Sequence, residues 1–87
     1  MSDQKYPKLQ LYGRSSCGYC RRVERVIQQL GIEQHIERCD ASYSSNWRQD
    51  LLQRTGRTQV PCLFVDDVPM FESLDIIAWL RRQFSNL

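Results

Sequence analysis

The chain has 87 residues, of which 41% are hydrophobic and 25% charged, and its formal net charge is +2. These values fit one small globular domain spanning residues 1–87, and the short apolar runs exclude a membrane-spanning helix. The near balance of charge, without a broad basic face, argues against a nucleic acid as partner. The first residues lack the apolar core of a signal peptide, so we expect a cytoplasmic protein whose residues 1–7 form a flexible tail.

The first half of the chain predicts a strand, a helix and a second strand. Residues 8–12 alternate apolar and other side chains, as in a half-buried strand. Apolar residues then recur from Val23 to Leu30 at the spacing of an amphipathic helix, and Gly31 provides its C-terminal stop. Residues 33–38 predict a second strand, placed mainly by the elements around it.

The second half predicts a helix, a β-hairpin and a last helix. Leu51 and its apolar neighbours mark a short helix. The wholly apolar residues 62–65 predict a buried strand, and residues 68–71, after an Asp-Asp turn, predict its partner. Pro69 indicates that this partner lies at a sheet edge. Ser73 is expected to cap the last helix, which carries an apolar stripe.

The order β-α-β-α-β-β-α, with a C-x-x-C motif after the first strand, predicts an α/β thioredoxin-like fold with a four-stranded mixed sheet flanked by three helices. Cys17 falls at the onset of the first helix, where free backbone N–H groups and the nearby Arg14, Arg21 and Arg22 favour a thiolate. Cys20 lies one helical turn further on, where its sulfur can meet that of Cys17. We therefore interpret Cys17 as the nucleophile and Cys20 as the resolving thiol.

Two other interpretations of the cysteines are weaker. A closed zinc site needs four nitrogen or sulfur ligands, but the chain has no second C-x-x-C, and His35, Cys39 and Cys62 lack ligand-like spacing to the first. No metal site formed by this chain alone is therefore expected. Inert buried thiols need neither a helix start nor arginine neighbours. That description suits Cys39 and Cys62, which we expect to be small buried apolar residues.

From about Lys8 to Phe84 the chain resembles a glutaredoxin. The resemblance rests on RSSCGYCRR around the cysteine pair, on TQVP at 58–61 and on FESLDIIAWL at 71–80. The segment FES replaces the usual glycine pair of that family and is similar to the N-terminal domain of glutathione transferases. On base rates the Val60–Pro61 peptide bond would be trans, whereas the resemblance implies the family's cis-proline.

The resemblance also implies which residues bind glutathione. Arg14 would contact the glycyl carboxylate, the backbone of Val60 would pair with the cysteinyl part, and the onset of the last helix would bind the γ-glutamyl end. Gln59 occupies the family's threonine position, and Tyr19 matches the aromatic residue of its C-P-Y-C motif. The expected glutathione-binding residues are thus Arg14, Tyr19, Gln59, Val60, Pro61, Glu72, Ser73 and Leu74.

The function implied by the resemblance is that of a glutathione-dependent thiol–disulfide oxidoreductase. Cys17 would attack protein–glutathione mixed disulfides and protein disulfides, and glutathione as reductant, or Cys20, would resolve the intermediate. The expected partners are glutathione and glutathionylated or disulfide-bonded proteins, with no nucleic acid and no membrane, and the chain is expected to be a monomer.

Two alternative functions compete with this enzyme. Gly18 stands where the family most often has proline, and some members without that proline form dimers. In these, Cys17 of each chain and two glutathione thiols would hold a [2Fe–2S] cluster. A transferase-type domain that activates glutathione through Tyr12, Ser15 or Ser16 is disfavoured, because no second helical domain follows in the sequence.

Overall fold

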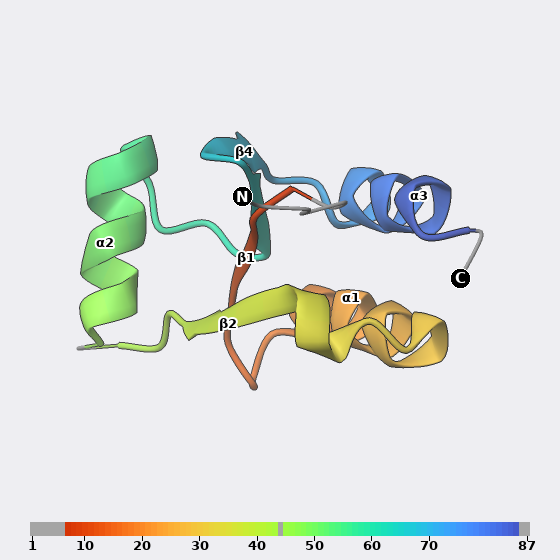
Figure 1. Ribbon diagram of the computed structural model, residues 1–87. Helices are drawn as coiled ribbons and strands as arrows, with labels where there is room; N and C mark the ends of the chain where they lie inside the picture. Colours follow the sequence, from red (N-terminus) through yellow and green to blue (C-terminus); the bar gives the residue numbers. More distant parts are fainter. Residues whose placement is uncertain (1–6, 44, 86–87) are drawn as a thin grey trace.

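A four-stranded mixed sheet with helices on both faces forms the centre of the structure, a computed structural model that describes residues 7–43 and 45–85 (Figure 1). The predicted tail over residues 1–7 lies, except for Pro7, outside the described residues. In chain order the elements are β1 (Leu9–Gly13), α1 (Gly18–Leu30), a 3₁₀ turn η1 (Glu33–His35), β2 (Ile36–Asp40), α2 (Asn46–Thr55), β3 (Cys62–Val65), β4 (Val68–Met70) and α3 (Ser73–Gln83).

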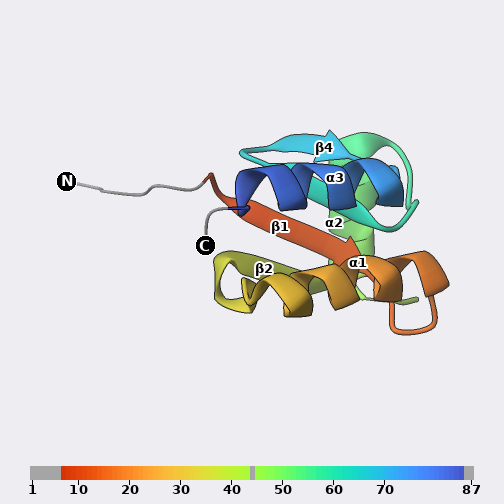
Figure 2. The same cartoon turned by 90° about the vertical axis from the view of Figure 1, so that its right-hand side faces the viewer.

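The strands follow the order β2-β1-β3-β4, with β1 parallel to β2 and antiparallel to β3, and β3 antiparallel to β4. Helices α1 and α3 lie side by side on one face of the sheet, and α2 lies alone on the other (Figures 1 and 2). This is the predicted thioredoxin-like fold. As expected, Pro69 lies in an edge strand, β4, where its missing N–H costs no hydrogen bond within the sheet.

The larger hydrophobic core lies between the sheet and the helices α1 and α3. Alternate residues of the strands point into it, as the twofold periodicity of a strand requires. The α1 residues predicted from their helical spacing pack against them. The buried members of this core are Leu9, Leu11, Val23, Ile27, Ile32, Ile36, Leu63, Ile76, Leu80 and Phe84.

The opposite face of the sheet explains why the central strand β1 is only partly apolar. Gln10 and Tyr12 point toward α2 and are buried, with 8% and 0% of their surfaces exposed. Gln10 donates to Glu37 at 3.1 Å and accepts from Arg54 at 3.1 Å. The Tyr12 hydroxyl donates to Asp50 and accepts from Arg54 at 2.9 Å. Because each buried polar group has a partner, its burial costs little.

Two predictions of element boundaries are wrong. Residues 33–35 form a 3₁₀ turn rather than the start of a strand, and β2 begins only at Ile36, where the chain meets Leu9 of β1. The three residues of this turn are exposed, so no alternation of buried side chains supports a strand there. Ser73 is the first residue of α3 and not its cap. Glu72 occupies the N-cap position, without a capping hydrogen bond from its side chain.

The turn predicted between the last two strands is confirmed. Asp66 and Asp67 both adopt positive φ, 49° and 73°, as the two central residues of a tight β-hairpin turn require. Aspartate tolerates this conformation better than most side chains. Among the described residues, no helix is long and apolar enough to cross a membrane.

Candidate functional site

The first turn of α1 holds the cysteine pair in the geometry that a reactive thiol needs. Cys17 is the N-cap of α1, and its Sγ accepts a hydrogen bond from the backbone N–H of Cys20 at 3.1 Å. Cys17 is partly exposed, whereas Cys20 has 7% of its surface exposed. The Cys17 sulfur thus receives a backbone donor at the positive end of the helix. The structure therefore agrees with Cys17 as the outer thiol and Cys20 as the inner one.

The end of β1 closes tightly around Cys20. A Cβ atom added to Gly13 would lie 3.3 Å from the Cys20 sulfur, so the absence of a side chain at residue 13 makes room for it. Burial raises the pKa of the Cys20 thiol to about 12, and a side-chain hydrogen bond with Cys17 adds to the effect, while the backbone and charge of Arg14 oppose it. Cys20 is thus a protonated thiol at neutral pH.

Cys39 and Cys62 are buried, as expected, with 1% and 0% of their surfaces exposed. Burial, followed by the charges of Glu37 and Asp50, raises the pKa of Cys39 to about 12. Burial also raises the pKa of Cys62 to about 11. Both thiols pack on the α2 face of the sheet with Tyr12 and Phe64, and they serve as small apolar core residues.

A groove beside α1 collects seven of the eight predicted glutathione residues, although they come from three separate segments of the chain. Its volume is about 420 Å³. Tyr19 in α1 forms one side, residues 59–61 before β3 form the second, and residues 72–74 at the start of α3 form the third. The Val60–Pro61 peptide bond is cis, as the resemblance to glutaredoxins implied and base rates did not.

Two further residues line this groove that the sequence did not assign to it. Phe71 directly precedes the predicted residues 72–74, and Arg22, expected only to add positive potential, lies three residues after Tyr19 on the same helical face. Arg57 stacks over the Phe71 ring at 4.3 Å from its centre and donates to the Gln59 side chain at 3.1 Å. Helical spacing from Tyr19 was the signal in the sequence that pointed to Arg22.

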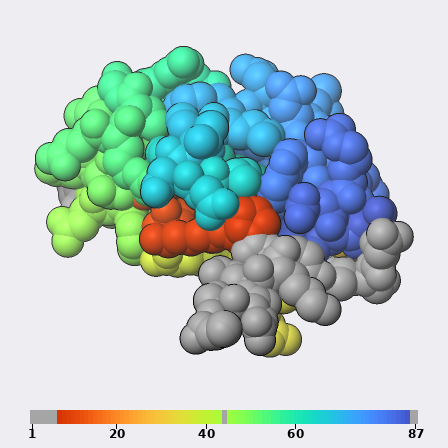
Figure 3. Space-filling model, turned by 45° about the horizontal axis from the view of Figure 1, so that its top comes forward, coloured from red at the N-terminus to blue at the C-terminus, as the bar shows by residue number. Residues whose placement is uncertain are grey.

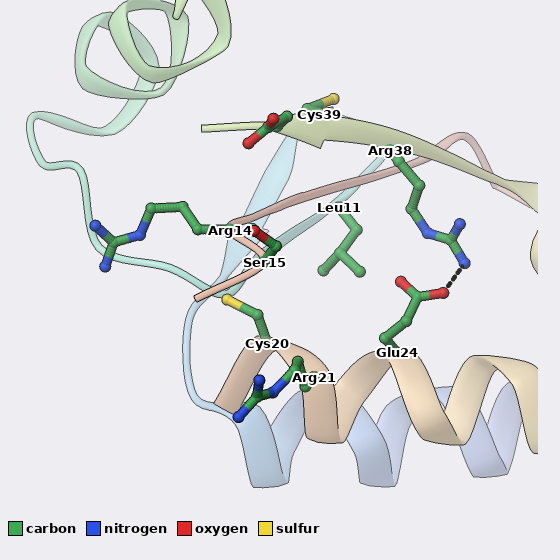
Figure 4. Close-up of a pocket in the computed structure, with 10 residues that line it drawn as sticks. Leu11, Arg14, Ser15, Cys20, Arg21, Glu24, Arg38 and Cys39 are labelled. Carbon is green, nitrogen blue, oxygen red and sulfur yellow. Dashed lines mark hydrogen bonds and ion pairs between the residues drawn. The ribbon is translucent and has the colours of Figure 1, made fainter. Parts of the chain in front are cut away.

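Arg14 is the predicted glutathione residue that does not line the groove. It borders a second cavity of about 400 Å³ on the Cys20 side of α1, and its guanidinium points away from that cavity (Figure 4). Its Nε is buried and has no hydrogen-bond partner among the described residues. The ion pair between Arg38 and Glu24, at 2.7 Å, lies at the other end of the cavity (Figure 4).

Nothing in the described part of the chain resembles a metal site. No three His, Cys, Asp or Glu side chains gather there closely enough to hold a metal ion. Cys39 and Cys62 belong to the core on the α2 face, and Cys39 also borders the cavity that Cys20 lines.

The fold and the placement of the cysteine pair define a thioredoxin-like domain with a C-x-x-C motif at the start of its first helix. The chain belongs to the family described as glutathione S-transferase, N-terminal domain, whose model matches residues 11–86. Glutaredoxins are among its homologues. Glutaredoxin 1 of Escherichia coli (strain K12) is 29% identical over 77 residues, a match that covers 83% of this chain and 91% of that protein.

Solved structures give the same two groups of relatives. A glutaredoxin from Brucella melitensis aligns with a TM-score of 0.65 and 25% identity, over 93% of this chain and 86% of that one. TDR1, a trimeric glutathione transferase of Leishmania, aligns with a TM-score of 0.74 and 29% identity over 91% of this chain. The present chain spans 17% of the transferase chain.

Proposed function

We propose that this protein is a glutathione-dependent thiol–disulfide oxidoreductase in which Cys17 is the nucleophile and Cys20 the resolving thiol. The observation that carries the proposal is the position of Cys17. It caps α1, accepts the Cys20 N–H, and precedes by two residues Tyr19, which lines the groove where seven of the predicted glutathione residues meet. The glutaredoxin and glutathione transferase relatives support a glutathione-related reaction.

The chemistry follows from thiol–disulfide exchange. The Cys17 thiolate attacks the glutathione sulfur of a protein–glutathione mixed disulfide, forms a Cys17–glutathione disulfide and releases the protein thiol. A second glutathione thiolate then attacks the glutathione sulfur of that adduct, which yields glutathione disulfide and returns Cys17. With a protein disulfide as substrate, Cys20 gives up its proton and attacks the Cys17 sulfur of the mixed disulfide, which leaves a Cys17–Cys20 disulfide.

The groove supplies groups that match the ends of glutathione. The first N–H groups of α3, at Ser73 and Leu74, have no partner within the helix and suit the γ-glutamyl carboxylate. The Glu72 side chain makes no capping hydrogen bond, so it is available to the γ-glutamyl ammonium group. Arg22 lines the groove, and Arg14 offers a buried unpaired Nε; both are candidates for the glycyl carboxylate.

Neither alternative function gains support from the structure. The Tyr12 hydroxyl is buried under α2 and bonded to Asp50 and Arg54, so it is not available to activate glutathione in the groove. Ser15 borders the other cavity and not the groove. The [2Fe–2S] dimer stays a prediction, for which neither the described side chains nor the names of the relatives offer an argument. Turnover through free thiols suits a reducing compartment such as the predicted cytoplasm.

The reduction of a glutathionylated peptide by glutathione tests the proposal, with Cys17→Ser and Cys20→Ser beside the parent. We expect Cys17→Ser to abolish release of the peptide thiol, because the remaining Cys20 is buried and protonated. Cys20→Ser is expected to retain it, because glutathione itself resolves the Cys17 adduct. Reduction of a protein disulfide should require both cysteines. Equal loss of the first reaction in the two variants would refute the assignment of roles.

A further inference from the structure

Arg54, near the end of α2, makes more polar contacts than any of its neighbours on that face of the sheet. Its Nη1 donates to the Tyr12 hydroxyl at 2.9 Å and to Gln10 Oε1 at 3.1 Å. Its Nη2 donates to Asp67 Oδ1 at 3.0 Å. The guanidinium carbon also lies 3.6 Å from the centre of the Phe64 ring. Arg54 itself does not line the groove.

These contacts join α2 to the β3–β4 turn. These two segments precede two sides of the groove in the chain. The side formed by residues 59–61 follows α2, which ends at Thr55, after a link of three residues. The side formed by residues 71–74 follows β4, and Asp67 lies in the turn that leads into that strand. The β3–β4 segment lies between α2 and the start of α3 (Figure 3, cyan between green and blue). Arg54 therefore holds the starting points of both sides in one network.

The path from Arg54 to the groove is short and hydrogen-bonded. Thr55 Oγ1 accepts the N–H of Arg57 at 3.2 Å and lies 2.8 Å from the carbonyl oxygen of Leu51, to which it donates. Arg57 then contacts both sides of the groove, since it bonds to Gln59 at 3.1 Å and stacks on Phe71 at 4.3 Å. A shift of the α2 terminus would thus move the groove.

Apolar packing alone does not fix α2 in place. Leu51 is the one residue of α2 that is fully buried, while Leu52 has 48% of its surface exposed and Trp47 has 36%. An amphipathic helix normally buries a stripe of several apolar residues. The position of α2 over the sheet therefore depends on the polar network around Arg54. Because hydrogen bonds are directional, this network also fixes the orientation of the helix.

We propose that Arg54 is a positioning residue for the glutathione groove: by binding β1 and the β3–β4 turn at once, it holds residues 59–61 and 71–74 at the separation that fits the ligand. The inference rests on the proposed function, because it takes the groove as the glutathione site. It assigns Arg54 no contact with glutathione.

Binding of S-methylglutathione and steady-state reduction of a glutathionylated peptide test this proposal. We expect Arg54→Ala to raise the Kd for S-methylglutathione and the KM for the peptide by about tenfold, because charge-assisted bonds are lost. We expect kcat at saturating substrate to stay within about twofold of the parent, because Cys17 keeps its place on α1. Arg54→Lys, which keeps the charge but not the fork of donors, should fall in between. Arg48→Ala is the matched control on the same helix, since Arg48 lies over the Tyr43 ring at 5.0 Å and outside the network.

A second pair of variants avoids the buried groups altogether. Asp67→Gly removes the exposed end of the network, and glycine accepts the positive φ of this position. We expect it to raise Kd by about threefold, the range of an exposed ion pair. Asp66→Gly, at the neighbouring position, which bonds to the Lys8 N–H, should leave Kd unchanged.

Equal Kd values for the parent, Asp67→Gly and folded Arg54→Ala would overturn the positioning role, as would a loss in kcat alone. If Arg54→Ala does not fold, the comparison of Kd between Asp67→Gly and Asp66→Gly decides the question. A parent that neither binds S-methylglutathione nor depends on Cys17 would instead refute the proposed function.

Discussion

The four cysteines should differ sharply in their reactivity toward an alkylating reagent, because only the thiolate form reacts. At pH 8 a thiol with the ordinary pKa of 9.0 is about one-tenth thiolate. With its pKa raised to about 11, Cys62 is about one-thousandth thiolate, and Cys20 and Cys39, with values of about 12, are about one ten-thousandth thiolate. Burial therefore slows their alkylation by about two to three orders of magnitude before any steric barrier is counted.

Mass spectrometry after a short treatment of the reduced protein with iodoacetamide at pH 8 provides the assay. We expect one label on the folded chain, at the partly exposed Cys17, and four labels in concentrated urea, where unfolding exposes the three buried thiols. Cys17→Ser should acquire no label in the same period. Native labelling of Cys39 or Cys62 at the rate of a small free thiol would refute the reasoning that burial keeps them protonated.

Two further predictions concern stability. The folded chain holds protons on three buried thiols that the unfolded chain releases near pH 9. The free energy of unfolding should therefore fall as pH rises from 8 to 10, by about 1 kcal/mol per thiol. Urea titrations at both pH values check this, and Cys39→Ala should remove about one third of the fall; a flat profile would contradict it. Gly13→Ala should leave the fold less stable than Gly18→Ala by about 1 kcal/mol, because the new methyl group would lie 3.3 Å from the Cys20 sulfur, which must shift to make room. Gly18→Ala, where a Cβ meets nothing within 4 Å, should be neutral or stabilising by about 0.5 kcal/mol; equal effects of the two changes would contradict the assigned crowding.

The sequence alone determined the order of the elements and the place of the cysteine pair. Each of these depends on local signals: the helical spacing from Val23 to Leu30, the glycine stop at residue 31, and the apolar run at 62–65 all act over a few residues. Residues 33–38, the segment with the weakest local pattern, contain one of the two wrong boundaries; the other is the start of α3, where Glu72 and not Ser73 is the N-cap. The start of β2 is decided by pairing with Leu9, which lies 27 residues away from Ile36 in the chain.

Only the tertiary structure decided how the site is assembled. The groove joins α1, residues 59–61 and the start of α3. Helical spacing from Tyr19 points to Arg22, whereas no local pattern reveals that Phe71 lines the groove. Likewise, the polar groups of Gln10 and Tyr12 can be buried in a central strand because folding brings Arg54 within hydrogen-bonding distance of them, across 44 and 42 residues of sequence. The physical reason is the same in both cases. Burial and hydrogen bonding of these side chains depend on contacts between segments that are distant in the sequence. Such contacts form only when the chain folds, and they leave no local pattern of residues.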